Sequence, residues 1–251
     1  MFKYFLKREI RESYLGNLTG FSWVLIQPIL TLIIYTIVFE KIFNAKFPEA
    51  ENIGFIVYLA IGFWPWIAFS EAILKSITAI TNKKDLIGKI KINLKDVVFA
   101  SVTATFIINV IGYFLVLLIL ILVGKEFNYA AIFLLILPIM QMYIFALALG
   151  LILSALQVFI RDTLHLMTTL ITLWFFSTPI IYSVSLIPES VRYYMQFNPM
   201  YTPITFIHNA ILSHKPLPWF EMGVFTIFIL ILLYLANKMF SKLAPHFEDY
   251  I

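Results

Sequence analysis

The chain has 251 residues, of which 61% are hydrophobic and 13% are charged, and its mean hydropathy is +0.92. A soluble domain is usually nearer half apolar and a quarter charged, so this composition excludes an ordinary soluble domain. Several apolar runs exceed the roughly 18 to 20 residues that a helix needs to cross the hydrocarbon layer, whereas strands of a membrane barrel alternate over about 10 residues. The sequence therefore predicts an all-α integral membrane protein. It has no cysteine, which excludes disulfides and thiolate chemistry.

The first segment, residues 2–18, is predicted to be an amphipathic helix that lies in the membrane interface. Its apolar residues recur at helical spacing and its basic residues occupy the rest of the helical wheel. The apolar set is Phe2, Phe5, Leu6, Ile10 and Tyr14, and the basic set is Lys3, Lys7, Arg8 and Arg11.

Six membrane spans are expected after this helix, in one transmembrane domain that covers residues 1–251. Their predicted bounds are 21–43, 54–79, 97–123, 130–158, 163–184 and 219–239. An even number of spans places both termini on the same side of the membrane.

The distribution of basic residues predicts which side that is. A net charge of +4 could suggest a nucleic-acid partner, but basic residues of membrane proteins collect in cytoplasmic loops, so we interpret the charge as a topology signal. Twelve of the 18 lie at the termini, in the loop after the second span and in the turn after the fourth, and five lie in the other connections. We therefore expect cytoplasmic termini and no nucleic-acid partner.

The loop "TNKKDLIGKIKINLKD" after the second span is predicted to hold a short cytoplasmic helix at about 82–92, capped by Asn82. Leu86, Ile87 and Ile90 form an apolar strip among lysines. One interpretation is a solvated basic loop beside anionic lipid. We favour docking into a partner, because an electrostatic loop would not need the strip. The turn at Arg161 and Asp162 is either a topological anchor or a second docking contact.

The connection from about 185 to 218 is the longest in the chain and lies on the outer side. Its content of Ile, Leu, Tyr, Phe and Met argues against disorder. Pro188 suits the first turn of a helix, and Asn198-Pro199 ends that helix. We predict short helices at about 188–197 and 203–214 that enter the outer face without spanning the membrane.

Few residues are candidates for chemistry. No phosphate-binding loop is present, so any ATPase must be another chain, and the histidines lack metal-ligand spacing. We expect no catalysis, no metal and no cofactor in this chain.

Two kinds of residue within the spans need an explanation. Glu71 and Lys75 are one helical turn apart and either neutralise each other or line a polar path. Aromatic residues in the spans either form interfacial belts or line a path on which sugar rings slide; the candidates are Tyr35, Phe39, Tyr58, Phe63, Trp66, Trp174, Phe175 and Tyr182.

Five segments in order resemble the membrane subunits of type-2 ABC exporters of polysaccharides, the O-antigen, capsule and teichoic acid permeases. They are "REIRESYLGNLTGFSWVLIQP" from Arg8, "GFWPW" from Gly62, "VFIRDTLHL" from Val158, "STPIIYSVSLIP" from Ser177 and "FNPMYTPITFIHNAIL" from Phe197. The resemblance covers almost the whole chain. Departures from the family pattern are Glu9 for Asp, Ser13 for Arg, Asn17 for Ser or Thr, and Ile92-Asn93 for Phe-Pro.

The resemblance implies a homodimer in the inner membrane, in contact with membrane lipids, that moves a lipid-linked polysaccharide outward. Two copies of a nucleotide-binding subunit would bind ATP and Mg. The loop helix would be the coupling helix received by the ATPase, and the two outer helices would form a gate. The implied coupling residues are Asp85, Leu86, Ile87, Lys89, Ile90, Arg8, Glu9, Arg11, Arg161 and Asp162, and the implied gate residues are Tyr193, Tyr194, Phe197, Asn198 and Pro199.

Three alternatives remain at this point. An exporter of lipid or drug from the same superfamily commonly has a larger outer domain, which this short chain lacks. A self-powered secondary transporter or channel predicts ionisable residues within spans, of which there are few. A membrane enzyme acting on lipid-linked sugars needs a cluster of carboxylates or histidines, and the sequence offers none.

Overall fold

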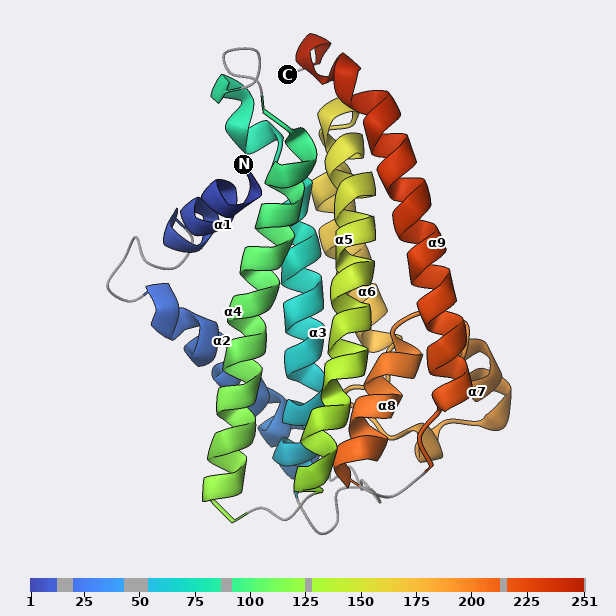
Figure 1. Cartoon of the computed structure of the whole chain (residues 1–251). Helices are drawn as coiled ribbons and strands as arrows, with labels where there is room; N and C mark the ends of the chain where they lie inside the picture. The colour runs from blue at the N-terminus through green and yellow to red at the C-terminus, as the bar shows by residue number, and fades with distance from the viewer. Residues whose placement is uncertain (13–19, 43–53, 87–91, 125–127, 213–215, 251) are drawn as a thin grey trace.

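The computed structural model describes residues 1–12, 20–42, 54–86, 92–124, 128–212 and 216–250. Within these ranges the chain is helical and has no strand, which confirms the all-α prediction. Both termini lie toward one end of a bundle of long helices, and α7 and α8 lie toward the other end (Figure 1). The helices are α1 (Phe2–Ile10), α2 (Gly20–Thr36), α3 (Phe55–Ile77), α4 (Leu94–Leu122), α5 (Ile136–Phe159), α6 (Thr163–Phe176), α7 (Glu189–Met195), α8 (Tyr201–Leu212) and α9 (Trp219–Leu243).

The centre of the bundle is α3. In its most apolar stretch 83% of the residues are buried, against 11% in the span that contains α2 and 22% in the span that contains α9. A helix that is apolar on all sides, as α3 is, has to be surrounded by other helices or by lipid. The outer helices instead expose Leu, Ile and Phe side chains, as expected for surfaces in contact with lipid.

Five helical segments are long and apolar enough to cross a membrane: Leu25–Ile42, Phe55–Lys84, Leu94–Leu122, Ala131–Phe159 and Trp219–Asp249. The first ends in a π-helical segment, η2 (Ile37–Ile42). The predicted fourth span begins as a 3-10 helix, η5 (Tyr129–Leu135), and Pro138 lies in the first turn of α5, where its missing N–H is tolerated. The last continues from α9 into η7 (Ala244–Asp249). The structure therefore confirms a multi-pass membrane protein, while the count of six spans stays a prediction.

The predicted fifth span, 163–184, is the one that is missing from these five segments. Its helix, α6, has 14 residues and ends at Phe176, which gives a length of about 21 Å at 1.5 Å per residue. Pro179 explains this end, because a proline lacks the N–H that would continue the helix and disfavours helical geometry in the residue before it. Residues 177–183 continue as turns, and Ile180 and Ile181 are buried there.

The segment before α4 differs in detail from the prediction. A 3-10 helix, η4 (Thr81–Leu86), follows α3, and its backbone is kinked at Lys83. The predicted coupling helix at 82–92 otherwise lies mostly outside the described residues, which include neither Ile87 nor Lys89 nor Ile90. Asn93, rather than Asn82, is the cap that the structure describes, because its Oδ1 accepts a hydrogen bond from the backbone N–H of Lys95 at 3.2 Å.

Two short helices occupy the long connection before α9. They are α7 and α8. The bounds of α7 lie within two residues of the prediction, and α8 begins two residues before its predicted start and ends at Leu212, the last described residue before 216. Gly62 lets α8 approach α3 closely: a Cβ on this residue would lie 2.6 Å from Nε2 of His208. The glycine of the "GFWPW" segment thus has a packing role that the sequence alone did not reveal.

Candidate transport site

Five of the predicted channel aromatics form one cluster where α2, α3 and α6 meet. Tyr35 stacks on Phe175 with ring centroids 6.0 Å apart and meets Phe63 edge to face at 5.8 Å. Trp66 contacts both Trp174 and Phe175 at 5.9 Å. We call Tyr35, Phe63, Trp66, Trp174 and Phe175 the aromatic cluster. Aromatic pairs of this geometry stabilise each other by about 0.5–1.5 kcal/mol beyond their burial.

The remaining three aromatics adjoin this cluster. Phe39 contacts Tyr35 with ring centroids 6.3 Å apart. Tyr58 is buried, lies 4.3 Å from the His208 ring and donates a hydrogen bond to the carbonyl of Tyr182 at 3.2 Å. Tyr182 in turn donates to the carbonyl of Phe176 at 2.9 Å. Tyr58 and Tyr182 therefore join α3 to the turn after α6, and the prediction that these side chains line a channel stays a prediction.

A polar stripe runs along α6, which the sequence analysis did not single out. His165, Thr168, Thr169 and Thr172 recur at helical spacing and are exposed. Each threonine donates its hydroxyl to the carbonyl four residues earlier, at 2.8 Å for Thr168, 3.3 Å for Thr169 and 3.0 Å for Thr172. Such bonds satisfy the donors in an apolar setting but leave oxygen lone pairs that can accept from a ligand. The spacing i, i+3, i+4, i+7 of these four polar residues is the sequence signal from which the stripe could have been predicted.

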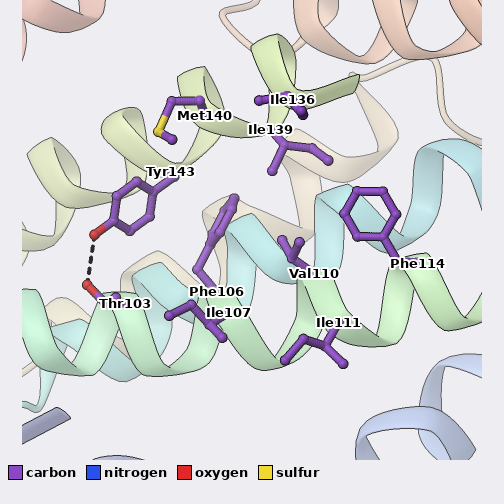
Figure 2. A pocket seen from close by; sticks show the side chains of 10 residues that line it. All are labelled: Thr103, Phe106, Ile107, Val110, Ile111, Phe114, Ile136, Ile139, Met140 and Tyr143. Atoms are coloured by element: carbon purple, nitrogen blue, oxygen red, sulfur yellow. Dashed lines mark hydrogen bonds between the residues drawn. The ribbon is translucent and has the colours of Figure 1, made fainter. Parts of the chain in front are cut away.

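The face between α4 and α5 has the opposite character. A hollow of about 430 Å³ lies there, and its lining is apolar apart from two hydroxyls, those of Thr103 and Tyr143 (Figure 2). These two hydroxyls bond to each other at 2.8 Å. Phe106, Ile107 and Met140 line the rest with other side chains of the same kind. This hollow suits hydrocarbon and offers little to a carbohydrate.

Asn198 connects the end of α6 to the start of α8. Its Oδ1 accepts from Nε1 of Trp174 at 2.7 Å and from the backbone N–H of Met200 at 3.0 Å. Its Nδ2 donates to the carbonyl of Ser177 and to the hydroxyl of Thr178, both at 3.0 Å. Both oxygen lone pairs and both N–H groups of the amide are thus engaged. Pro199 follows directly, so the backbone turns into α8 at this residue.

The other predicted gate residues lie on or next to α7 and point away from the core. Tyr193, Tyr194 and Phe197 are 60%, 72% and 72% exposed. Tyr193 meets each of the other two rings edge to face at 5.7 Å. Three exposed aromatic rings gathered around Tyr193 form a surface that can pack on lipid or on a second molecule. Their assignment to a pore mouth stays a prediction.

The candidate coupling residues lie at the end that holds the termini. Glu9 accepts from Nζ of Lys83 at 2.7 Å, and this pair joins α1 to η4. Phe5 is buried with Ala79, Val97 and Ala100, so one side of α1 packs on α4 and on the turn after α3. Arg8 pairs with Glu12 at 2.6 Å, and the hydrogen bond with Glu12 raises the pKa of Arg8.

The turn between α5 and α6 exposes Arg161 and Asp162 together. Gln157 holds this turn from below: its Nε2 donates to the carbonyl of Arg161, and its Oε1 accepts from the backbone N–H of Leu164, both at 2.9 Å. Gln157 is a positioning residue that sequence reasoning missed, because its partners become evident only in the folded turn. Asp85 and Leu86 lie in η4, but nothing is described of their side chains.

The fold and these surfaces define a class: a multi-pass helical membrane protein with a packed centre, an exposed polar stripe and a charged end. Across the described residues, no group of three or more His, Asp or Glu is placed to hold a metal. The family model described as "ABC-2 type transporter" matches residues 1–212, and the chain belongs to this family.

Similar curated proteins cover nearly the whole chain. An "O-antigen export system permease protein RfbA" of Myxococcus xanthus is 30% identical, over 98% of this chain and 93% of its own length. A protein of the same name from Klebsiella pneumoniae is 24% identical, over 96% and 91%. The "Polysialic acid transport protein KpsM" of Escherichia coli is 22% identical, over 93% and 89%. Membership in this family makes the chain a transport component rather than an enzyme, and it implies an ATPase partner.

Proposed function

We propose that this chain is the membrane permease of an exporter that moves a lipid-linked polysaccharide of the O-antigen type from the cytoplasm outward. A separate subunit binds ATP and Mg and supplies the energy. The observation that carries the proposal is the polar stripe on α6, exposed within a membrane protein and next to the aromatic cluster. The names of the relatives, which refer to O-antigen export and polysialic acid transport, support the same class of substrate.

The chemistry of the stripe fits a carbohydrate. Threonine oxygens accept hydrogen bonds from sugar hydroxyls, and flat aromatic faces contact sugar C–H groups without fixing one position. A moving polymer needs many weak contacts of this kind rather than one tight site. In the hollow between α4 and α5 the two hydroxyls, those of Thr103 and Tyr143, are engaged with each other. This hollow therefore offers fewer polar contacts than the stripe, and the path is proposed to run along α6 and α2.

The same surfaces support the proposal of a homodimer. The outward faces of α2 and α6 are exposed in one chain; Ile29, Ile33, Leu166 and Leu170 are examples. A second copy facing them encloses a path between the two chains. We place the assembly in the inner membrane with its termini in the cytoplasm, in agreement with the basic residues at that end.

Coupling to the ATPase is assigned to the end that holds the termini. The proposed contact comprises the segment around Asp85, Leu86, Ile87, Lys89 and Ile90, with Arg8, Glu9, Arg11, Arg161 and Asp162 beside it. The Glu9–Lys83 pair connects α1 to this segment, so a push on η4 is transmitted to α1 and, through Phe5, to α4.

The opposite end is proposed to be the outer gate. Asn198 holds α6 and α8 together in the closed arrangement, and Tyr193, Tyr194 and Phe197 cover the mouth of the path. Opening then requires the Asn198 hydrogen bonds to break or to move as one unit with Pro199.

The proposal is tested by reconstituting the full-length chain with its ATPase and measuring polysaccharide export and ATP hydrolysis together. Replacing Leu86→Asp and Ile87→Asp together is expected to abolish export while hydrolysis and membrane insertion persist. The reason is that the apolar strip of Leu86, Ile87 and Ile90 then carries two charges. The matched control is Lys84→Asp, which adds the same acidic group on the exposed side of η4. Export without any ATPase, driven by an ion gradient, would contradict the proposal, and so would unchanged export by the double variant.

A further inference from the structure

The charges of α1 are sorted onto two sides of the helix. Both carboxylates of α1 and the turn that follows it are engaged, Glu9 with Lys83 at 2.7 Å and Glu12 with Arg8 at 2.6 Å. Lys3, Lys7 and Arg11 are exposed, and no ion pair of theirs is found among the residues that the structure describes. Within the described part of the chain, one face of this segment therefore carries three cations without an ion-pair partner.

These three cations border a hollow of about 290 Å³. Leu6 and Ile10 also line it, and these five described residues follow one face of the helix at positions i, i+3, i+4, i+7 and i+8. The lining is almost entirely apolar, because the long basic side chains present their aliphatic stems to the hollow and carry the charges at its rim.

The hollow lies on the side of α1 away from Phe5, although Leu6 at its edge also packs against the cluster of Phe5, Ala79, Val97 and Ala100. Phe5 is 3% exposed and packs on Ala79, Val97 and Ala100. Figure 1 shows α1 beside α4 and inclined to it, near the end that holds both termini. A helix held in this way beside membrane-spanning helices meets the lipid headgroup region with its free face.

We propose that the hollow formed by Lys3, Leu6, Lys7, Ile10 and Arg11 binds one anionic phospholipid, with the headgroup phosphate at the cationic rim and the start of an acyl chain on Leu6 and Ile10. The argument is charge complementarity combined with an apolar lining. An acidic protein segment would use the charges but would leave the apolar hollow unfilled, whereas a phospholipid matches both. This inference does not depend on which substrate the protein exports.

The experiment counts lipid bound to the purified full-length chain by native mass spectrometry after titration with phosphatidylglycerol or phosphatidylcholine. Replacing Lys3→Gln, Lys7→Gln and Arg11→Gln together is expected to lower phosphatidylglycerol binding at least fivefold and to leave phosphatidylcholine binding unchanged. The control removes the same charge elsewhere with Lys84→Gln, Lys238→Gln and Lys242→Gln, all exposed, and should change binding less than twofold. Wild-type binding by the first variant, or an equal loss in the control, would overturn the proposal.

Two further measurements separate the sources of the same chemistry. Binding of phosphatidylglycerol to the unaltered chain should weaken as salt is raised from about 50 to 500 mM, because exposed charges are screened; this test needs no variant that could misfold. Millimolar inorganic phosphate should not displace the lipid, and displacement would indicate a free-phosphate site instead. Loss of ATPase co-purification with unchanged lipid binding in the triple variant would indicate a protein-docking face and would likewise overturn the proposal.

Discussion

Different kinds of contact hold the helices together at the two ends of this bundle. At the end with the termini, α1 and η4 are joined by the ion pair of Glu9 and Lys83, whose side chains are 18% and 10% exposed, and Arg161 and Asp162 lie open to solvent. At the opposite end, Asn198 makes four hydrogen bonds within the chain, and α8 packs on α3 at Gly62.

This difference indicates different roles. Exposed charges exchange water for a protein or lipid partner at small net free energy, so the first end is suited to receiving a partner. An internal network whose donors and acceptors are all satisfied gains nothing from a partner and opens only when it is broken as a unit. The second end is therefore suited to staying closed until the bundle moves.

The largest expected effect is at Asn198. Asn198→Ala removes up to four hydrogen bonds worth about 1 kcal/mol each, so we expect a loss of about 2–4 kcal/mol in the free energy of unfolding, measured by thermal denaturation in detergent. Gln196→Ala, an exposed amide two residues earlier, is the matched control and should be near neutral. Equal effects of the two variants would remove Asn198 as the element that distinguishes this end.

A smaller effect is expected at Gly62. Gly62→Ala puts a methyl group 2.6 Å from Nε2 of His208, and overpacking of this kind typically destabilises by about 1–3 kcal/mol. The control is Gly223→Ala in α9, where nothing lies within 4 Å of the added Cβ; it should be neutral or stabilise by up to about 1 kcal/mol. Unfolding midpoints in detergent measure both, and a stabilising Gly62→Ala would show that α8 does not depend on this close approach.

The smallest effect is expected for the ion pairs at the first end. A double-mutant cycle with Glu9→Gln and Lys83→Gln should give a coupling of about 1 kcal/mol, because the pair is mostly buried. The same cycle with Arg8→Gln and Glu12→Gln should give less than about 0.5 kcal/mol, because that pair is exposed. A coupling above about 2 kcal/mol for either pair would contradict the view that this end is held loosely.

Much of the fold was predictable because apolar length decides a membrane span. The bounds of α3 and α9 follow from runs of apolar residues, and Asn198-Pro199 separates α7 from α8 as predicted. The end of α6 was misjudged because Ile180 and Ile181 extend the apolar run beyond Pro179. Hydropathy does not register the backbone N–H that proline lacks.

The contacts at the site were harder to predict from the sequence than the helices. Asn198 was predicted as a gate residue, but its bond to Trp174 joins residues 24 apart, and the Glu9–Lys83 pair joins residues 74 apart. Neither pairing has a local signature. The polar stripe on α6 does have one, the helical recurrence of His165, Thr168, Thr169 and Thr172, and it was overlooked because a single threonine in a span needs no explanation.

The substrate path along α6 is tested most directly by the amount of polysaccharide exported per ATP hydrolysed, measured on the full-length chain reconstituted with its ATPase. Thr168→Val and Thr172→Val together keep the shape of α6 and remove two hydroxyls from the stripe, so export per ATP should fall about tenfold while hydrolysis persists. Thr103→Val makes the same chemical change in the apolar hollow and should leave export per ATP within about twofold of the unaltered protein. An unchanged ratio in the α6 variant, or an equal fall in both variants, would contradict a substrate path along α6.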